Sequence, residues 1–153
     1  MADRNLYKVS DYLTLHGKKE KEMFVYRHKV NYYETDRMGV THHSNYIRFM
    51  EEARVAFLDS IGASYAKLEA DGFISPVVEV NGRFKHTTTF DDVIEISVWI
   101  KSATTFKLKL GYEMRCNGAL VFEGYSLHCF LDQDGKPIPF DDLYPQFRAQ
   151  MQA

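Results

Sequence analysis

The side chains best suited to chemistry lie in one segment, Glu34–Tyr46, with the sequence ETDRMGVTHHSNY. Asp36 lies seven positions before His43, with Gly39 between them and a helix-like pattern directly after them. An extended loop of that length spans at most about 23 Å, but a glycine allows the chain to fold back. The Asp36 carboxylate could then face the start of the helix, where free backbone N–H groups and the positive dipole end stabilise an oxyanion. A base or nucleophile beside such a site suits acyl transfer to water.

A structural interpretation of the same residues stays open. Aspartate in a loop commonly accepts a hydrogen bond from its own backbone two residues later, so Asp36 could simply stabilise a turn. His43 is equally compatible with an ordinary loop position. Spacing alone does not choose between a turn and a catalytic site.

Three other chemistries fit the sequence poorly. The segment Gly124–His128, GYSLH, resembles a nucleophile elbow, but it lacks the final glycine and lies in a strand-like pattern that would not expose Ser126. His42 and His43 are adjacent, so their side chains diverge in an extended segment, and no HExxH motif accompanies them. No glycine-rich phosphate loop with its lysine occurs.

A strand and a helix are predicted on either side of the Asp36 segment. Apolar and polar side chains alternate from Met23 to Tyr32, which is typical of a half-buried strand. Apolar residues then recur every three or four positions and predict one long helix over Ser44–Gly62. Ser44 or Asn45 could cap its start, and Gly62 is placed to end it. The apolar stripe comprises Tyr46, Phe49, Met50, Ala53, Phe57, Leu58 and Ile61.

The chain after this helix is predicted to be strands. The runs are SPVVEVNGRFKHTT, VIEISVWIK, FKLKLGYEMRC and ALVFEGYSLHCFL, the first with a candidate bulge at Asn81-Gly82. Asn117-Gly118 predicts a type I′ hairpin between the last two runs. In that register Cys129 faces Phe106 and not Cys116, so no disulfide is expected.

One strand, one long helix and four strands predict an α+β fold in which an antiparallel sheet wraps around the helix, an arrangement called hotdog. A length of 153 residues fits one such domain. We assign it to residues 23–140, after a polar N-terminal extension over 1–22 and before a C-terminal tail over 141–153. A lone sheet leaves its edges open, so pairing with a second copy is expected.

The composition of the chain limits which classes of partner and which cellular compartment are expected. A formal charge of −2 gives no electrostatic footprint for nucleic acid or an anionic membrane. The spacing of the two cysteines matches no zinc motif and indicates reduced thiols. No apolar run approaches the about 20 residues of a membrane span, and the start of the chain lacks the apolar core of a signal peptide. We therefore expect a soluble, cytoplasmic protein with neither nucleic acid nor membrane as a partner.

The segment Tyr32–Arg54 resembles the signature of the 4-hydroxybenzoyl-CoA thioesterase family, including its YbgC-like branch of acyl-CoA thioesterases. That signature is an aromatic strand end, then TDxxGVVYHxxY and a helix with ExAR, and the match is gapless. The likeness extends over roughly Phe24 to Leu131. The matching residues are Thr35-Asp36, Gly39-Val40, His43, Tyr46, Glu51 and Ala53-Arg54.

The resemblance implies the hotdog fold, a homodimer or homotetramer, and hydrolysis of acyl-CoA thioesters without a metal or an organic cofactor. Asp36 matches the family's catalytic aspartate, which acts either as general base or as nucleophile. His43 matches the position whose backbone N–H polarises the thioester carbonyl, and its side chain could help to position the acyl group or water. The family's usual Val-Tyr is Thr41-His42 here, which alters the pocket wall.

Two alternatives use the same residues. The substrate could be an acyl-acyl-carrier-protein thioester, or the chain could bind acyl-CoA or an acyl carrier without hydrolysis, with Asp36 only a turn residue. Glu51 and Glu52, farther along the helix, are expected in solvated or dimer-edge positions, and Arg54 is expected to pair with Glu51 at i, i+3.

Overall fold

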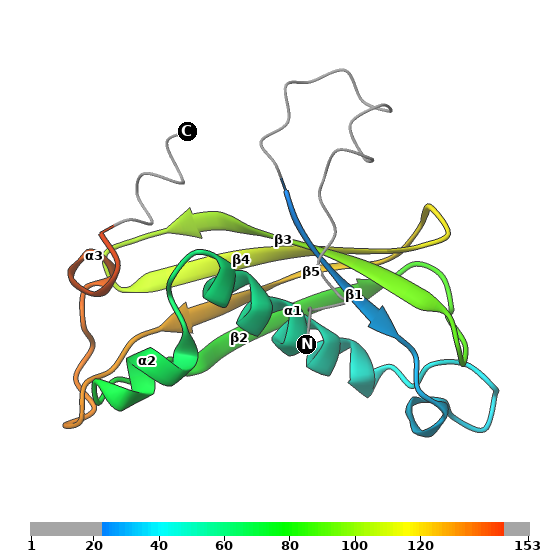
Figure 1. Cartoon of the computed structure of the whole chain (residues 1–153), viewed down its shortest axis with the longest axis horizontal. Helices are drawn as coiled ribbons and strands as arrows, with labels where there is room; N and C mark the ends of the chain where they lie inside the picture. The colour runs from blue at the N-terminus through cyan, green and yellow to red at the C-terminus, as the bar shows by residue number, and fades with distance from the viewer. Residues whose placement is uncertain (1–22, 146–153) are drawn as a thin grey trace, which may run out of the picture.

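The computed structural model describes residues 23–145, which form one antiparallel sheet around one long helix (Figure 1). The elements in chain order are β1 (Phe24–Lys29), the 3₁₀ turn η2 (Tyr32–Glu34), α1 (Ser44–Ser60), α2 (Tyr65–Ala70), β2 (Val77–Phe84), β3 (Val93–Ala103), β4 (Lys107–Cys116), β5 (Ala119–Cys129) and α3 (Phe140–Leu143). The strand order is β1-β3-β4-β5-β2. This confirms the predicted α+β class and hotdog arrangement. The predicted extension over 1–22 lies outside the described residues.

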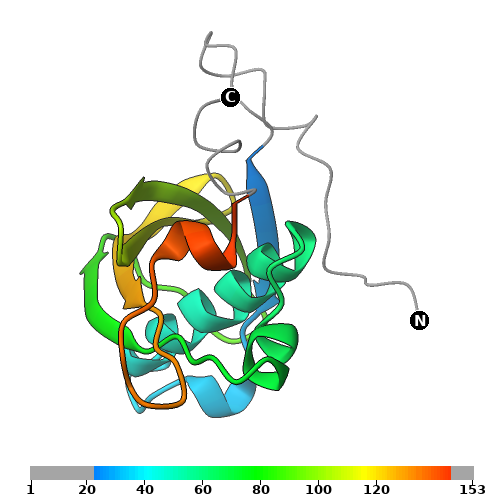
Figure 2. The same ribbon diagram turned by 90° about the vertical axis from the view of Figure 1, so that its left-hand side faces the viewer.

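Helix α1 lies on the concave side of the sheet, which curves around it (Figure 2). It packs against β1 and β3, and its predicted apolar stripe is the face that it buries. Each large apolar side chain removed from water in this way contributes roughly 1.5–3 kcal/mol. The buried residues of the stripe are Tyr46, Phe49, Met50, Ala53, Phe57 and Leu58. The facing core residues of β3 and β4 are Ile94, Ile96, Val98, Leu108, Leu110, Tyr112 and Met114.

The two ends of α1 differ in how well they follow the sequence pattern. Its N-cap is His43, with no side-chain cap, so the prediction of a Ser44 or Asn45 cap is wrong. The Asn45 amide instead donates to the backbone oxygen of Glu34, at 2.9 Å, and thus binds the preceding turn. Gly62 ends the helix as predicted, with a φ of +78° that glycine adopts without strain.

The hairpin between β4 and β5 has the predicted turn. Asn117 and Gly118 have φ angles of 50° and 81°, the positive values that a type I′ turn needs at both central residues. Cys116 pairs with Ala119 directly outside the turn. Local turn chemistry therefore sets the start of this pairing.

The register of the same hairpin changes farther from the turn. A bulge between Met114 and Arg115 adds one residue to β5, so Cys129 lies opposite Lys107 and not opposite Phe106. The predicted partner of Cys129 is therefore wrong by one position. The predicted absence of a disulfide is confirmed, since both cysteines are free.

The candidate bulge in β2 is also displaced. Asn81 and Gly82 pair regularly with β5, and the irregularity lies at the start of the strand, between Val77 and Glu79. Gly82 serves a different purpose, because a Cβ there would lie 2.5 Å from the ring of Phe122. The glycine permits close packing of that ring against the strand.

Strand β1 ends earlier than predicted, at Lys29. Tyr32 was expected on the buried face, but it lies in η2 and is 77% exposed. The cause is Glu34, whose carboxylate accepts the backbone N–H of Asn31 at 2.7 Å and folds the chain into a turn. A side chain five residues beyond the end of β1 therefore overrides the alternating pattern.

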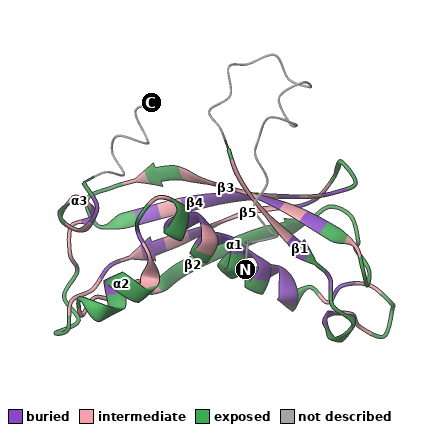
Figure 3. Ribbon diagram, in the orientation of Figure 1, coloured by how far each residue is buried: buried purple, intermediate pink, exposed green. Residues whose placement is uncertain are grey.

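The edge strand β2 is exposed along its whole length (Figure 3). It is the last strand of the sheet, so within residues 23–145 its outer backbone groups have no neighbouring strand. Its exposed side chains include Val77, Val78, Val80 and Phe84. An apolar, open edge of this kind is a template for pairing with another chain.

Candidate functional site

The loop that follows η2 folds back on itself, as predicted from its glycine. The backbone N–H of Asp36 donates to the oxygen of Val40 at 2.8 Å, and the N–H of Gly39 donates to the oxygen of Asp36 at 3.0 Å. Gly39 has a φ of +79°, a conformation that other residues rarely adopt. Asp36 is thereby held at the base of a closed turn.

The Asp36 carboxylate is half-buried and has one oxygen in use. Its Oδ1 accepts the backbone N–H of Met38 at 2.8 Å, so the turn role considered from sequence is present. The other oxygen has no partner among the described residues. Asp36 and His43 are not joined by a hydrogen bond within the described part of the chain. The aspartate can therefore stabilise its turn and still offer a free oxygen.

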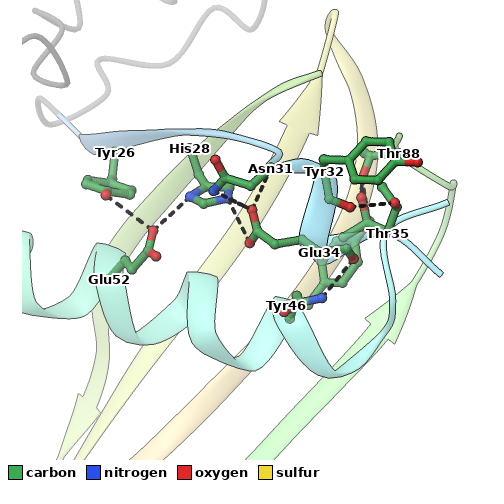
Figure 4. Close-up of polar contacts among 11 residues, drawn as sticks. Tyr26, His28, Asn31, Tyr32, Glu34, Thr35, Tyr46, Glu52 and Thr88 are labelled. Atoms are coloured by element: carbon green, nitrogen blue, oxygen red, sulfur yellow. Dashed lines mark hydrogen bonds and ion pairs between the residues drawn. The ribbon is translucent and has the colours of Figure 1, made fainter. Parts of the chain in front are cut away.

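The loop is held from one side by the connection between β2 and β3. The backbone N–H of Thr41 donates to the oxygen of Thr88 at 2.8 Å, and their hydroxyls lie 2.6 Å apart. The Tyr46 hydroxyl lies 2.9 Å from that of Thr88, and burial raises the pKa of this phenol. The Thr89 hydroxyl donates to the oxygen of Gly39 at 2.7 Å. These bonds fix the loop and the first turn of α1 on a common support; Figure 4 labels Tyr46 and Thr88 among the residues involved.

The start of α1 offers an unpaired backbone donor. The N–H of His43 has no partner among the described residues, and that of Ser44 makes only a long contact of 3.3 Å with Nδ1 of His42. The first turn contains no acidic side chain that would neutralise the positive end of the helix. A developing negative charge near His43 would therefore meet a free donor and a favourable dipole.

The two adjacent histidines do not diverge, in contrast to the prediction. Their ring centroids lie 4.2 Å apart, because His43 has helical backbone angles of −54° and −32° and the segment is not extended. Nδ1 of His42 lies 2.8 Å from the hydroxyl of Ser44. No group of three or more potential metal ligands occurs in the part of the chain that the structure describes.

A buried charge cluster beside the loop was not predicted from the sequence. His28, which is 8% exposed, lies between two carboxylates, with Nδ1 2.8 Å from Glu52 and Nε2 2.8 Å from Glu34. Burial lowers the pKa of His28, but the hydrogen bonds and charges of Glu52 and Glu34 outweigh it and raise the pKa above 6.5. The sequence signal was a histidine on the apolar side of β1.

The expectations for the helix carboxylates hold only in part. Glu51 is exposed, as expected, and lies 3.8 Å from the guanidinium of Arg54. Glu52 binds His28 and is not simply solvated. Arg54 is itself buried, and its closer contact is with the Tyr65 hydroxyl, at 3.1 Å.

A serine–histidine pair lies in the core below Arg54. The Ser126 hydroxyl lies 2.6 Å from Nε2 of His128 and 2.6 Å from the hydroxyl of Tyr112, and Ser126 is 0% exposed. Burial, together with the charge of Arg54, lowers the pKa of His128 to about 3, so the imidazole is neutral. Its Nδ1 is buried without a partner among the described residues, where a Ser-His-Asp triad would have a carboxylate. The pair is unsuited to nucleophilic catalysis, in agreement with the prediction.

Comparison with known proteins identifies the family. The family model described as the thioesterase-like superfamily matches residues 30–150. A Bacillus subtilis protein provisionally named acyl-CoA thioesterase YneP is 33% identical over 123 residues, which cover 79% of this chain and 89% of that protein.

Two solved structures are similar over most of the chain. A Thermus thermophilus protein described as hypothetical is 34% identical with a TM-score of 0.78, covering 82% of this chain and 97% of its own. A DHNA-CoA thioesterase from Staphylococcus aureus is 28% identical with a TM-score of 0.78, covering 84% of this chain and 87% of its own.

No helix in the described region is both long enough and apolar enough to cross a membrane. With the folded-back aspartate loop at the start of the central helix, the family match shows that the chain belongs to the thioesterase-like superfamily, whose reaction is thioester hydrolysis.

Proposed function

We propose that the chain hydrolyses an acyl-CoA thioester to the free acid and CoA at the Asp36 loop and the start of α1. The observation that carries this proposal is that one hydrogen-bonded loop before α1 contains both a half-buried carboxylate with a free oxygen, at Asp36, and an unpaired backbone N–H, at His43. The relatives named for CoA thioesters favour CoA as the carrier.

Thioester hydrolysis needs a donor that stabilises the oxyanion and a group that acts as base or nucleophile, and the chain has a residue for each role. The N–H of His43 donates to the thioester oxygen and stabilises the negative charge of the tetrahedral intermediate. As general base, Asp36 takes a proton from water while the hydroxyl attacks the carbonyl carbon. As nucleophile, Asp36 instead forms an anhydride that water then opens. In both routes the C–S bond breaks and the CoA sulfur leaves as a thiolate, which takes up a proton.

The class of reaction is tested directly with the purified chain. We expect release of free thiol from at least one member of a panel of acyl-CoAs that varies in chain length and aromatic character. The same acyl groups on an acyl carrier protein form the second arm, and faster cleavage there would favour the carrier-protein alternative. Binding of acyl-CoA without thiol release from any of them would contradict hydrolysis and favour a binding protein.

We further propose a homodimer formed through β2, or a tetramer built from such dimers. An open, apolar edge strand buries its side chains and satisfies its backbone groups when a second copy pairs with it. Pairing of this kind is consistent with substrate binding at the interface. A cytoplasmic location is part of the same proposal, supported by the two free thiols, which reducing compartments preserve.

A Ser126→Ala variant separates this mechanism from a serine mechanism. We expect the kcat for thiol release to stay within about twofold of wild type, because Ser126 does not touch the substrate in our proposal. The free energy of unfolding should fall by about 1–3 kcal/mol, since His128 and Tyr112 lose a buried hydrogen-bond partner. Urea unfolding measures this loss. A stable variant whose kcat has fallen a hundredfold would instead make Ser126 the nucleophile.

A further inference from the structure

Glu34 connects the buried charge cluster to the proposed catalytic loop. Its side chain holds Asn31 and His28, with Oε1 2.8 Å from Nε2 of the imidazole. Its backbone oxygen accepts two hydrogen bonds from the other end of the loop, the N–H of His42 at 2.8 Å and the amide of Asn45 at 2.9 Å. One residue thus spans the gap between the end of β1 and the start of α1, two positions before the proposed catalytic aspartate.

The imidazole of His28 must carry two protons to make its contacts. Both ring nitrogens face carboxylate oxygens, and an ionised carboxylate only accepts hydrogen bonds. Glu52 faces the ring from α1 and Glu34 faces it from η2 (Figure 4). The Tyr26 hydroxyl, from β1, adds a third contact to the cluster by donating to Glu52 at 3.3 Å.

Apolar residues of α1 and β3 also neighbour the imidazole. The Phe49 ring of α1 packs against it with a centroid separation of 4.1 Å, and on β3 the cross-strand neighbour of His28 is Ile94. A charge pair in such surroundings is less screened than one at the surface, and removing one partner leaves an uncompensated buried charge. The His28 imidazole therefore helps to hold the Glu34 carboxylate, together with the two hydrogen bonds that Asn31 donates to it.

We propose that doubly protonated His28 is a positioning residue for thioester hydrolysis: by holding Glu34, it fixes the Asp36 loop against the start of α1. This rests on the proposed role of Asp36 as the reacting group. When His28 loses its second proton, one of its two ring nitrogens can no longer donate a hydrogen bond to the carboxylate that it faces. That hydrogen bond is lost, and the support of the loop weakens.

The sign of the pH effect follows from the contacts. The two carboxylates raise the pKa of His28 above 6.5 in spite of its burial. The stabilisation is fully present below the unfolded value of about 6.5 and is lost as the pH rises through the folded pKa. The loop should therefore be best ordered on the acid side and should loosen at alkaline pH.

Nuclear magnetic resonance tests the coupling without any activity. In wild type we expect the His28 imidazole to titrate above pH 6.5 and the backbone amides of residues 36–43 to shift with the same midpoint. His28→Gln retains His42 and His43, so the shifts that those residues cause remain and the His28 component disappears. An imidazole that titrates at or below pH 6.5, or loop shifts identical in the two proteins, would overturn the proposal.

Kinetics test whether the coupling matters for hydrolysis. For His28→Gln we expect kcat to fall about tenfold at pH 6.5 while KM stays within about twofold, the pattern of a misplaced catalytic group. The alkaline decline of wild-type kcat should vanish in this variant. In Glu52→Gln, which removes only the more exposed carboxylate, the decline should move to lower pH. A loss of kcat in His28→Gln that is equal at every pH would contradict the positioning role.

A matched control is available on the opposite face of β1. Glu95→Gln breaks the ion pair with Arg27, whose nitrogen lies 2.6 Å from the carboxylate, without touching the loop. We expect its kcat and its pH profile to match those of wild type. If wild type cleaves no thioester at all, the proposed function fails, while the resonance titration still decides whether His28 positions the loop.

Discussion

Replacement of Asp36 by asparagine is expected to lower kcat for thioester cleavage by about 10²–10⁴-fold, the usual contribution of a positioned general base. Asparagine has the same shape, and its amide oxygen can still accept the N–H of Met38, which Asp36 accepts at 2.8 Å. The turn should therefore persist while the negative charge is lost. Thiol release under saturating acyl-CoA measures the effect, and thermal unfolding shows whether the fold is retained.

The matched control is Asp132→Asn, which makes the same change in another turn. The Asp132 carboxylate accepts the backbone N–H groups of Asp134 and Lys136, each at 2.9 Å, in the loop after β5. This variant should cleave as wild type does. If Asp36→Asn also cleaves at the wild-type rate, the assigned mechanism is wrong although the reaction class stands.

Introduction of glutamate at Val80 is expected to convert the proposed dimer to a monomer. In a two-fold symmetric pairing of β2 edges, each substitution enters the interface twice, so two carboxylates meet where two valines packed. We expect the dimer dissociation constant to rise at least about a hundredfold, since burying an unpaired charge costs several kcal/mol. Light scattering over a concentration series measures the constant.

Val93→Glu is the control for this change. Val80 and Val93 are both 40% exposed, but Val93 lies on β3, next to Lys29 of β1 and away from the β2 edge. It should leave the dimer intact. Hydrolysis should fall together with dimer formation in Val80→Glu, because the site is proposed to lie at the interface. A dimeric and active Val80→Glu protein would exclude β2 as the pairing edge.

Features with a local cause could be predicted from the sequence. The period of α1 specifies its buried face, because residues three and four apart lie on the same side of any helix. The Asn117-Gly118 turn needs positive φ at two positions, and these residue types meet that need locally. The fold-back of the Asp36 loop follows from Gly39 in the same way.

Features that depend on individual side-chain contacts or on strand irregularities were missed. Tyr32 leaves the strand because Glu34 captures the end of β1, and the bulge in β5 shifts Cys129 by one position. Asn45 was expected to cap its own helix but binds the preceding turn. These features depend on individual contacts and on a strand irregularity that compete with local preferences, and sequence periodicity carries no information about them.

The sequence by itself determined which residues could act in the site, namely one aspartate and one glycine in a loop before an amphipathic helix. Through these residues it also indicated the family and the fold. Only the tertiary structure decided that His28 lies between Glu34 and Glu52, residues of a strand, a turn and a helix. Their meeting depends on how α1 is rotated on the sheet, which the packing of the whole apolar stripe sets. A histidine on the apolar side of a strand thereby acquires one buried and one exposed anionic partner beside the proposed catalytic loop.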